Sequence, residues 1–383
     1  MNNLNFLVDV LKESPVFKTL EKNVKPGRTV CASGLSTINK SNIIYALCRL
    51  KGVTAFCLAS DEKEAQTLCN DLSCMGLRAY VYPVRDFNFL DFQSRSHEYE
   101  HARLKVLLKL LNHECDVAIA CVDAAAQLTV PRNVLEQSVI EFEEGRELSL
   151  EKATKALTLL GYERFDAVEG SGQFSLRGGI LDFFMPDSDY PVRCEFWGDE
   201  ITDLSYFDIE TQRRFKKADK ITLSPSTEIV IEDRAALADK IEHKAKLLRS
   251  KNSAKAKEKL FSEAELIRSG AMIANADKFI NQIYDKPESL FDYLDRNTLV
   301  FASEFTAIQE RGKSMDFISN ETLMQGFEDG TLCRGFDRFA LTFNECTEFL
   351  QSHGTIVLEN FVHGSMPLKL SEIISFSTKQ LSA

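Results

Sequence analysis

Residues 173–184 read QFSLRGGILDFF, and residues 192–207 read VRCEFWGDEITDLSYF. In each stretch, two runs of β-forming residues flank a two-residue loop, Gly-Gly in the first and Gly-Asp in the second. Loops of this composition permit the positive φ angles that tight hairpin turns require. The two stretches therefore predict two antiparallel hairpins, and the amphipathic segment 150–160 adds one helix to a small α+β unit.

The chain before this unit alternates between apolar β-rich runs and amphipathic segments of helical length. The expected strands are 28–33, 53–59, 79–81 and 116–120, and the expected helices are 41–50, 61–72 and 97–111. Alternation of this kind predicts a parallel sheet that helices cover on both faces.

The chain after this unit begins with a charged helical stretch, 232–270, whose lysines alternate with acidic residues at helical spacing. Such spacing favours a solvated helix surface over a nucleic-acid-binding face. Three further β runs follow at 298–302, 355–358 and 373–376, so the α/β character returns. We therefore expect the hairpin-rich unit to be an insertion into one composite α/β domain.

The composition of the chain excludes several classes of protein. With 383 residues, the chain is long enough for two or three domains. Its hydrophobic content of 44% and charged content of 27% exclude bulk disorder, and no run of apolar residues is long enough for a membrane helix. The net charge of −11 argues against a general nucleic-acid coat protein. Ten cysteines without a visible secretory signal predict reduced thiols and a cytoplasmic location.

The segment after the first expected strand, GLSTINKS from Gly34 to Ser41, lies in the position of a phosphate-binding loop. The full motif, G-x-x-x-x-G-K-[ST], places a second glycine before the lysine, and Asn39 stands there in this chain. A Cβ at that position crowds the loop where it closes on a phosphate, although Lys40 and Ser41 are retained. No convincing acidic ligand for Mg²⁺ follows a later strand, because Asp123 comes without a second acid. We expect a decayed site that does not hydrolyse nucleotide.

Residues 97–101, HEYEH, match the zinc motif H-E-x-x-H in form. The segment is polar and opens a helix, where Glu98 and Glu100 favour the positive end of the helix dipole. No third ligand is evident, since His113 lies three turns further along. We therefore expect no metal site, and without a G-x-S-x-G nucleophile elbow we expect no catalytic residues.

The first hairpin combines an arginine with an aromatic residue. Along an extended strand Phe174 and Leu176 point one way, and Ser175 and Arg177 point the other. Arg177 abuts the glycine turn, so we expect it to be exposed. An exposed arginine beside an aromatic ring on a rigid hairpin is typical of a protein-binding anchor, and a solvated arginine beside a core phenylalanine explains the pattern equally well.

The runs 164–184, 193–201 and 207–213 closely resemble the bacterial transcription-repair coupling factor family (Mfd) and, less closely, the excision-repair helicase UvrB. The segment from Tyr82 to Asp86 and the stretch from Ser94 to Leu104 also look like parts of the module that these families share. The resemblance covers essentially the whole chain. It implies a RecA-like α/β domain begun by residues 1–126 and completed by 223–383, with an inserted UvrA-binding domain at 127–222.

Two departures separate the two homologues. UvrB keeps an intact phosphate loop and hydrolyses ATP, whereas Asn39 fits the degenerate module of the coupling factor. UvrB also carries a long aromatic DNA-clamping hairpin, for which the stretch 59–103 leaves no room. The resemblance therefore implies a non-catalytic adaptor without a cofactor, since ATP and Mg²⁺ belong to the family's motor domains, which this sequence lacks. A UvrB-like nucleotide-dependent DNA-damage helicase or ATPase is the alternative.

The resemblance also assigns partners. The inserted domain of the family recruits UvrA to a stalled RNA polymerase, and its basic contact residues fall on Arg164 and Arg177, with Phe174 in the same motif. Some relatives carry a further basic residue where this chain has Ser175. We expect both arginines to project to one solvent-facing patch near Phe174. The intact family members mask this surface with their own C-terminal domain, and they contact RNA polymerase and double-stranded DNA through regions absent here.

Overall fold

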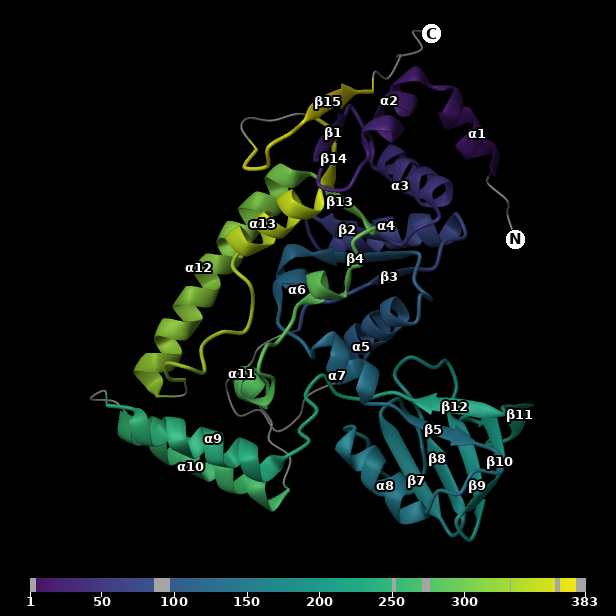
Figure 1. The fold of residues 1–383 in the computed structure, drawn as a ribbon, viewed down its shortest axis with the longest axis vertical. Coiled ribbons are helices and arrows are strands. Elements are labelled where there is room, and N and C mark those ends of the chain that lie inside the picture. The colour runs from purple at the N-terminus through teal and green to yellow at the C-terminus, as the bar shows by residue number, and fades with distance from the viewer. Residues whose placement is uncertain are drawn as a thin grey trace.

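The computed structural model describes residues 5–85, 97–249, 253–270, 276–330, 332–361 and 366–376. The molecule is elongated, with a large sheet and its helices at one end and a smaller sheet at the other (Figure 1). Helices α9 (Arg234–Leu247) and α10 (Ser253–Ser269) lie beside one another, away from both sheets.

Within the described part of the chain, seven parallel strands form the large sheet in the order β15-β1-β14-β13-β2-β4-β3. The strands are β1 (Val30–Ser33), β2 (Ala55–Ala59), β3 (Ala79–Val81), β4 (Val117–Cys121), β13 (Leu299–Ser303), β14 (Thr355–Glu359) and β15 (Glu372–Ser375). Strands from the two ends of the chain thus lie side by side in one sheet: β1 lies between β15 and β14, and β13 pairs with β2. The expected α/β fold class with a parallel sheet is confirmed.

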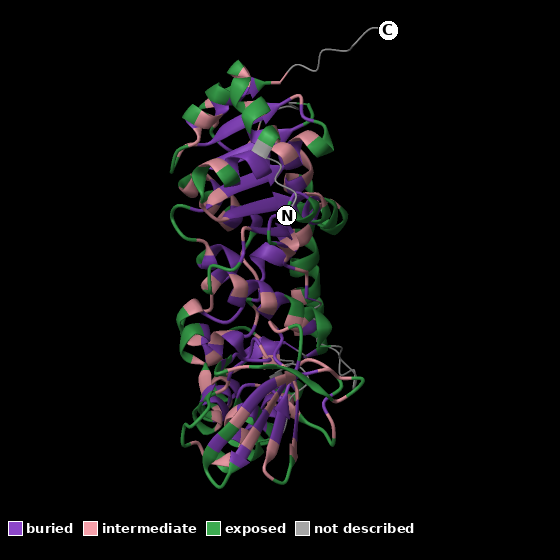
Figure 2. Cartoon of the chain, turned by 90° about the vertical axis from the view of Figure 1, so that its right-hand side faces the viewer, coloured by how far each residue is buried: buried purple, intermediate pink, exposed green. Residues whose placement is uncertain are grey.

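Helices cover both faces of this sheet. One face packs against α1 (Asn5–Glu13), α2 (Pro15–Asn23), α3 (Thr37–Lys51) and α4 (Glu62–Cys74). The other face packs against α5 (Glu98–Leu111), α6 (Val122–Ala126), α12 (Phe305–Asp329) and α13 (Phe343–His353). Because apolar side chains leave the sheet in both directions, the strands are buried almost throughout (Figure 2).

The smaller unit contains both expected hairpins. In the described residues its main sheet has the order β11-β10-β9-β8-β7-β6. Its strands are β6 (Glu163–Arg164), β7 (Gln173–Arg177), β8 (Ile180–Phe183), β9 (Val192–Trp197), β10 (Glu200–Phe207) and β11 (Arg214–Lys217). Helix α8 (Leu150–Leu159) and the paired strands β5 (Ile140–Glu143) and β12 (Lys220–Leu223) close its apolar core. The predicted hairpins and helix are confirmed, whereas β5, β6 and β12 had no clear local signal.

The charged stretch folds as the helix pair α9 and α10, and their apolar faces share a small core with Phe279 and Phe336. The basic residue Arg268 pairs with Asp239 and Glu242 on the surface of this pair. The prediction of a solvated helical surface with interleaved charges is therefore consistent with the structure.

A buried ion pair joins the two units. Arg103 of α5 and Glu228 are both fully buried, and Arg103 Nε donates to Glu228 Oε1 at 2.6 Å. The guanidinium also donates to the Gln127 side chain at 2.8 Å and lies 4.1 Å from the centre of the Tyr82 ring. Gln127 belongs to the segment that leaves the large sheet, and Glu228 to the segment that returns from the smaller one.

Further hydrogen bonds complete the environment of Glu228. Thr129 Oγ1 donates to Oε2 of Glu228 at 2.7 Å. The backbone N–H of Glu228 donates to the Glu100 carboxylate at 2.8 Å. The Tyr284 hydroxyl donates to its carbonyl at 2.9 Å. The Tyr82 and Arg103 positions of the family motif thus have a structural role, whereas Asp86 and Ser94 lie outside the described residues.

We predict that Glu228→Gln destabilises the protein by about 3 kcal/mol, because it leaves the Arg103 charge buried without a counter-charge. Denaturant unfolding measures the change. Asp189→Asn is the matched control, because it removes the partner of Lys105 on the exposed side of the same helix and should cost no more than about 1 kcal/mol. Equal small losses in both variants would contradict the structural role of the buried pair.

Candidate functional site

The phosphate-loop position follows β1 at the carboxyl edge of the large sheet. Gly34 has φ of 81°, and a Cβ there would lie 2.1 Å from the carbonyl oxygen of Phe376. The N–H groups of Gly34 and Leu35 donate to the carbonyls of Asn360 and Glu359, both at 3.1 Å. These amides are therefore engaged with backbone rather than turned towards a ligand.

The rest of this segment is wound into helix. Helix α3 begins at Thr37, so Asn39 lies in its first turn with helical backbone rather than in an open loop. The sequence motif places Asn39 in the loop, whereas here the helix starts three residues before Lys40 and includes Asn39. The loop that remains before the helix is Gly34 to Ser36, and the amides of Gly34 and Leu35 within it are already engaged.

The retained Lys40 and Ser41 both have internal partners. Lys40 is 3% exposed, and its Nζ donates to Ser303 Oγ at 3.0 Å and to Glu304 Oε1 at 2.5 Å. Glu64 Oε1 lies 3.6 Å from the same nitrogen. Ser41 Oγ donates to Asp71 at 2.9 Å. Carboxylates thus neutralise the lysine that would otherwise meet a phosphate.

A second carboxyl group lies behind Glu304. Glu359 at the end of β14 is fully buried, and its Oε1 accepts the N–H of Phe305 at 2.8 Å. Its Oε2 has no hydrogen-bond partner among the described residues. Burial, and then the neighbouring Glu304, raise the pKa of Glu359 to about 7. Burial raises the pKa of Glu304, but the hydrogen bond to Lys40, the positive charge of Lys40 and the N–H of Asn360 together outweigh it, so this pKa is lowered.

Sequence reasoning missed both Glu304 and Glu359. Each follows or ends a β run of the tail, and acidic residues at strand ends are the signal that could have drawn attention to them. Asp123, which was considered as a metal ligand, instead pairs with Arg311 at 2.8 Å. The charged side chains at the carboxyl edge of the large sheet are therefore paired with one another, Lys40 with Glu304 and Arg311 with Asp123.

The partner-binding candidates lie at one side of the smaller sheet. Arg164 is exposed on the edge strand β6, and its register partner on β7 is Phe174. Phe174 is only 3% exposed and belongs to the apolar core, so it is a core phenylalanine, the second of the two explanations of this pattern, and not an exposed contact residue. The exposed ring next to Arg164 is Phe165, which is 44% exposed and whose N–H donates to the Phe174 carbonyl at 2.9 Å.

Arg177 is exposed at the hairpin end, as expected, but it has a partner. Its Nη2 donates to Asp182 at 3.0 Å, and Arg193 binds both oxygens of the same carboxylate at 2.8 Å. Asp182 is 1% exposed. Arg177 is therefore fixed by a buried carboxylate that Arg193 already neutralises. Ser175, where some relatives carry a basic residue, is buried and donates to the Asp166 carbonyl at 3.2 Å.

The two arginines start from different faces of the sheet. Register partners in a parallel ladder point to the same side, so Arg164 leaves on the side of Phe174. Arg177 lies three residues after Phe174 on the same strand, so its side chain points to the opposite face of the sheet. The two residues thus share the β6–β7 edge rather than one flat patch, which corrects the expected arrangement.

The HEYEH segment lies between the two units. His101 is buried to a large extent, with its Nε2 3.0 Å from Ser226 Oγ, and burial lowers its pKa. His97 Nδ1 lies 3.1 Å from Glu100, and the two imidazole rings stack 5.9 Å apart. In the described residues, no group of three or more metal-binding side chains is found. The histidines therefore contribute to the junction of the units.

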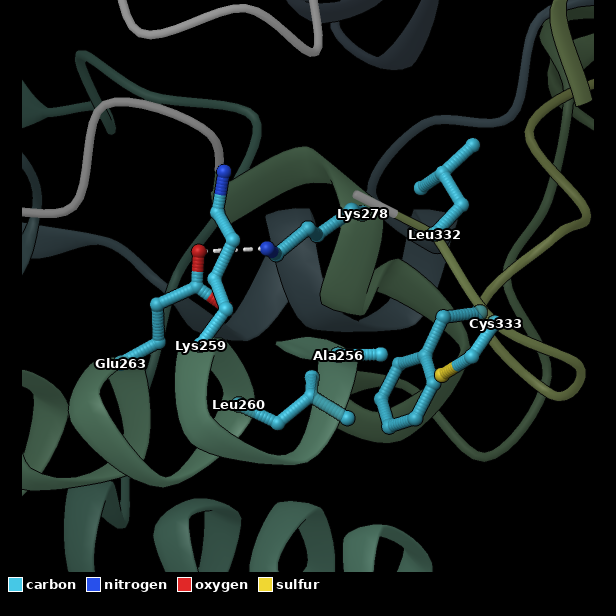
Figure 3. Close-up of a pocket in the computed structure, with 8 residues that line it drawn as sticks. Ala256, Lys259, Leu260, Glu263, Lys278, Leu332 and Cys333 are labelled. Atoms are coloured by element: carbon cyan, nitrogen blue, oxygen red, sulfur yellow. Dashed lines mark hydrogen bonds and ion pairs between the residues drawn. The ribbon is translucent and has the colours of Figure 1, made fainter. Parts of the chain in front are cut away.

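A cavity in the helical part is too small for a ligand. It has a volume of about 10 Å³ and is lined by Lys278, Glu263, Cys333 and Phe336 among others. The ammonium of Lys278 lies 2.5 Å from Glu263 across it (Figure 3). This volume suits a single water molecule.

Comparisons with known proteins support the predicted family resemblance. A family model described as "UvrB interaction domain" matches residues 140–229. The transcription-repair-coupling factor of Bacillus subtilis is 28% identical over 332 residues, 84% of this chain and 28% of that protein. The protein of the same name from Staphylococcus epidermidis is 26% identical over 78% of this chain and 26% of its own length. That from Staphylococcus aureus is 22% identical over 98% of this chain and 32% of its own length.

The resemblance to the transcription-repair coupling factors is therefore confirmed over most of the chain, and the hairpin-rich unit carries the UvrB interaction domain. The chain spans about a quarter to a third of the length of these relatives. The domain limits at residues 127 and 222 stay a prediction. Among the described residues, every helix is too short or too polar to span a lipid bilayer.

The Glu304–Glu359 pair predicts a specific pH dependence. Because the pKa of Glu359 rises from 4.5 to about 7 on folding, the folded state holds this proton to a higher pH than the unfolded chain. The stabilisation is present below the unfolded value and is lost as the pH rises towards 7. Glu359→Gln should therefore remove part of the fall in unfolding free energy between about pH 5 and pH 8, measured by denaturant unfolding.

The matched control is Glu372→Gln, which removes a half-exposed carboxylate of β15 that is paired with Arg28, just before strand β1 of the same sheet. This control should keep the pH dependence of the wild-type protein. An unchanged slope in Glu359→Gln would show that Glu359 does not hold a proton in the folded state.

Proposed function

We propose that this chain is a non-catalytic adaptor that recruits UvrA in transcription-coupled nucleotide excision repair. The observation that carries the proposal is the match of residues 140–229 to the UvrB interaction domain, in a chain similar to transcription-repair coupling factors. The matched residues include Arg164 and Arg177, the two candidate contact residues. RNA polymerase and double-stranded DNA, as partners of an intact coupling factor, are part of the same proposal.

The β6–β7 edge offers chemistry suited to an acidic partner surface. Arg164 is exposed, and Arg177 has a side chain that is 53% exposed while one of its nitrogens is held by Asp182. A guanidinium held in this way can still bind a partner carboxylate in bidentate fashion, at a small entropic cost. Phe165 adds an exposed aromatic ring on a backbone that is hydrogen-bonded to β7. An exposed aromatic ring next to an arginine is typical of a binding anchor.

The arrangement around Lys40 supports the adaptor over the UvrB-like ATPase. A phosphate would have to displace the carboxylates of Glu304 and Glu64 from Lys40 and compete with their negative charge. It would also need the amides of Gly34 and Leu35, which are engaged with backbone carbonyls. These contacts oppose nucleotide binding at the position where UvrB-type enzymes require it.

The first test concerns the partner surface. Arg164→Ala and Arg177→Ala should each weaken binding to UvrA by about tenfold or more, because a truncated guanidinium leaves a partner carboxylate unpaired. Calorimetry with the cognate UvrA measures the affinity. Lys155→Ala is the control, since Lys155 is exposed on α8 of the same unit and pairs only with Glu151 among the described residues. Unchanged affinity in the Arg164/Arg177 double variant would remove this edge from the proposal.

Thermal stability separates binding from folding in that experiment. Arg164→Ala should leave the melting temperature unchanged, and Arg177→Ala should lower it slightly, because Asp182 keeps Arg193 as its main partner. Phe174→Ala should instead destabilise the unit by about 3 kcal/mol or more, since a buried ring is lost from its core.

The second test concerns nucleotide. Mg-ATP should bind at the Lys40 position no tighter than about 1 mM, or about −4 kcal/mol. Calorimetric titration of the wild-type protein and of Lys40→Met measures this, because binding elsewhere would survive the substitution. Micromolar affinity that disappears in Lys40→Met would overturn the adaptor and favour the UvrB-like enzyme.

A further inference from the structure

A second, larger cavity lies at the edge of the large sheet opposite to Lys40. It has a volume of about 390 Å³ and is formed where α3 ends and where β2, β3, β4 and β13 begin. Its polar lining includes Arg49, Arg78, His113, Asp116, Asp295 and Asn297. A volume of this size is in the range of small-molecule sites. We call this feature the amino-edge cavity.

The acidic groups of the amino-edge cavity are already neutralised. Asp116 accepts the Arg78 guanidinium at 2.8 Å and the Arg78 backbone N–H at 2.8 Å, and these bonds lower its pKa despite its burial. Asp295 is paired with Arg132 at 3.0 Å. Neither carboxylate therefore leaves an unbalanced negative charge in the cavity.

Of the two arginines that line the cavity, Arg78 is balanced by Asp116, whereas Arg49 has no ion pair among the described residues. Arg49 donates one hydrogen bond to the Gly76 carbonyl at 2.9 Å, and no carboxylate of the described residues lies within ion-pair distance of it. Arg78 is held in place by Asp116 and by the His113 carbonyl at 3.3 Å, so its remaining N–H groups are fixed in direction. The cavity thus presents two guanidinium groups with donors to spare.

His113 adds a third donor by an unusual backbone conformation. It follows the C-terminal end of α5 with φ of 54°, a position where glycine is favoured and most side chains are disfavoured. His113 therefore lines the cavity in a backbone conformation that costs some energy. Observed strain of this kind is a reason to look for a function.

From this geometry we propose that the amino-edge cavity binds a small phosphorylated ligand. Arg49, Arg78 and His113 donate to the phosphate oxygens, because guanidinium groups match the geometry of phosphate and several donors suit its several oxygens. Asp295 and Asn297 are placed to accept or donate hydrogen bonds to hydroxyl or amino groups of the rest of the ligand. The proposal is independent of UvrA recruitment, since it concerns the other unit of the chain.

Inorganic pyrophosphate is the probe for a test by calorimetry at low salt with the whole 383-residue chain. The wild-type protein should bind it with a Kd of about 0.1–1 mM. Arg49→Gln should weaken binding by about tenfold, the equivalent of one charge-assisted hydrogen bond. His113→Asn should weaken it in the same direction and should fold, because asparagine also tolerates positive φ.

Lys51→Gln is the matched control, because it removes one positive charge from the same helix but does not line the cavity, and it should leave the affinity unchanged. Three outcomes would overturn the proposal. The first is no saturable binding up to about 10 mM pyrophosphate. The second is an equal loss in Lys51→Gln and Arg49→Gln, which would indicate general charge attraction. The third is tighter, Arg49-dependent binding of a short DNA duplex, which would assign the site to a nucleic-acid backbone.

Discussion

The buried pair of Arg103 and Glu228 is the contact on which the two-unit arrangement depends. The chain leaves the large sheet through residues 127–130 and returns through residues 226–230, and the pair binds one segment to the other through α5. A charge inside protein is costly unless its partner is fixed, so this geometry tolerates little displacement of either segment. The smaller sheet is joined to the larger one at this point, where His101 of α5 also contacts Ser226.

The carboxyl edge of the large sheet shows how a fold of the nucleotide-binding type is stabilised without a nucleotide. Lys40 and Ser41 keep the positions of a phosphate loop, but Glu304 and Asp71 supply the negative charge that a ligand supplies elsewhere. Because these internal carboxylates balance the charge of Lys40, the fold needs no bound anion at this position. They also explain how a decayed loop can retain its lysine, because the lysine has a packing and electrostatic role of its own.

Local sequence signals predicted a large part of the fold. The strands of the large sheet and the two hairpins were found because alternation, turn glycines and helix caps act within a few residues. Contacts between distant segments were not found: Glu304 and Glu359 meet Lys40 from more than 260 residues away. The burial of Phe174 was left open, because a period of two separates the two faces of a strand and does not say which face is covered. The long α12 gave no clear signal, since Phe317, Ile318 and Met324 are apolar but lie on its exposed side.

Helix α12 connects two distant parts of the molecule. Its first residue is fixed by Glu359 at the sheet, and Gly330 at its far end lies against Lys255 and Ala256 of α10 (Figure 1). Its 25 residues span about 37 Å as a continuous helix. Such a helix acts as a lever, because a tilt of about 5° at the sheet moves its other end by about 3 Å. Because Arg311 pairs with Asp123 and Asp316 accepts the N–H of Phe343, the first half of α12 is held against the large sheet, and a shift of this packed region would move the helix pair at the other end.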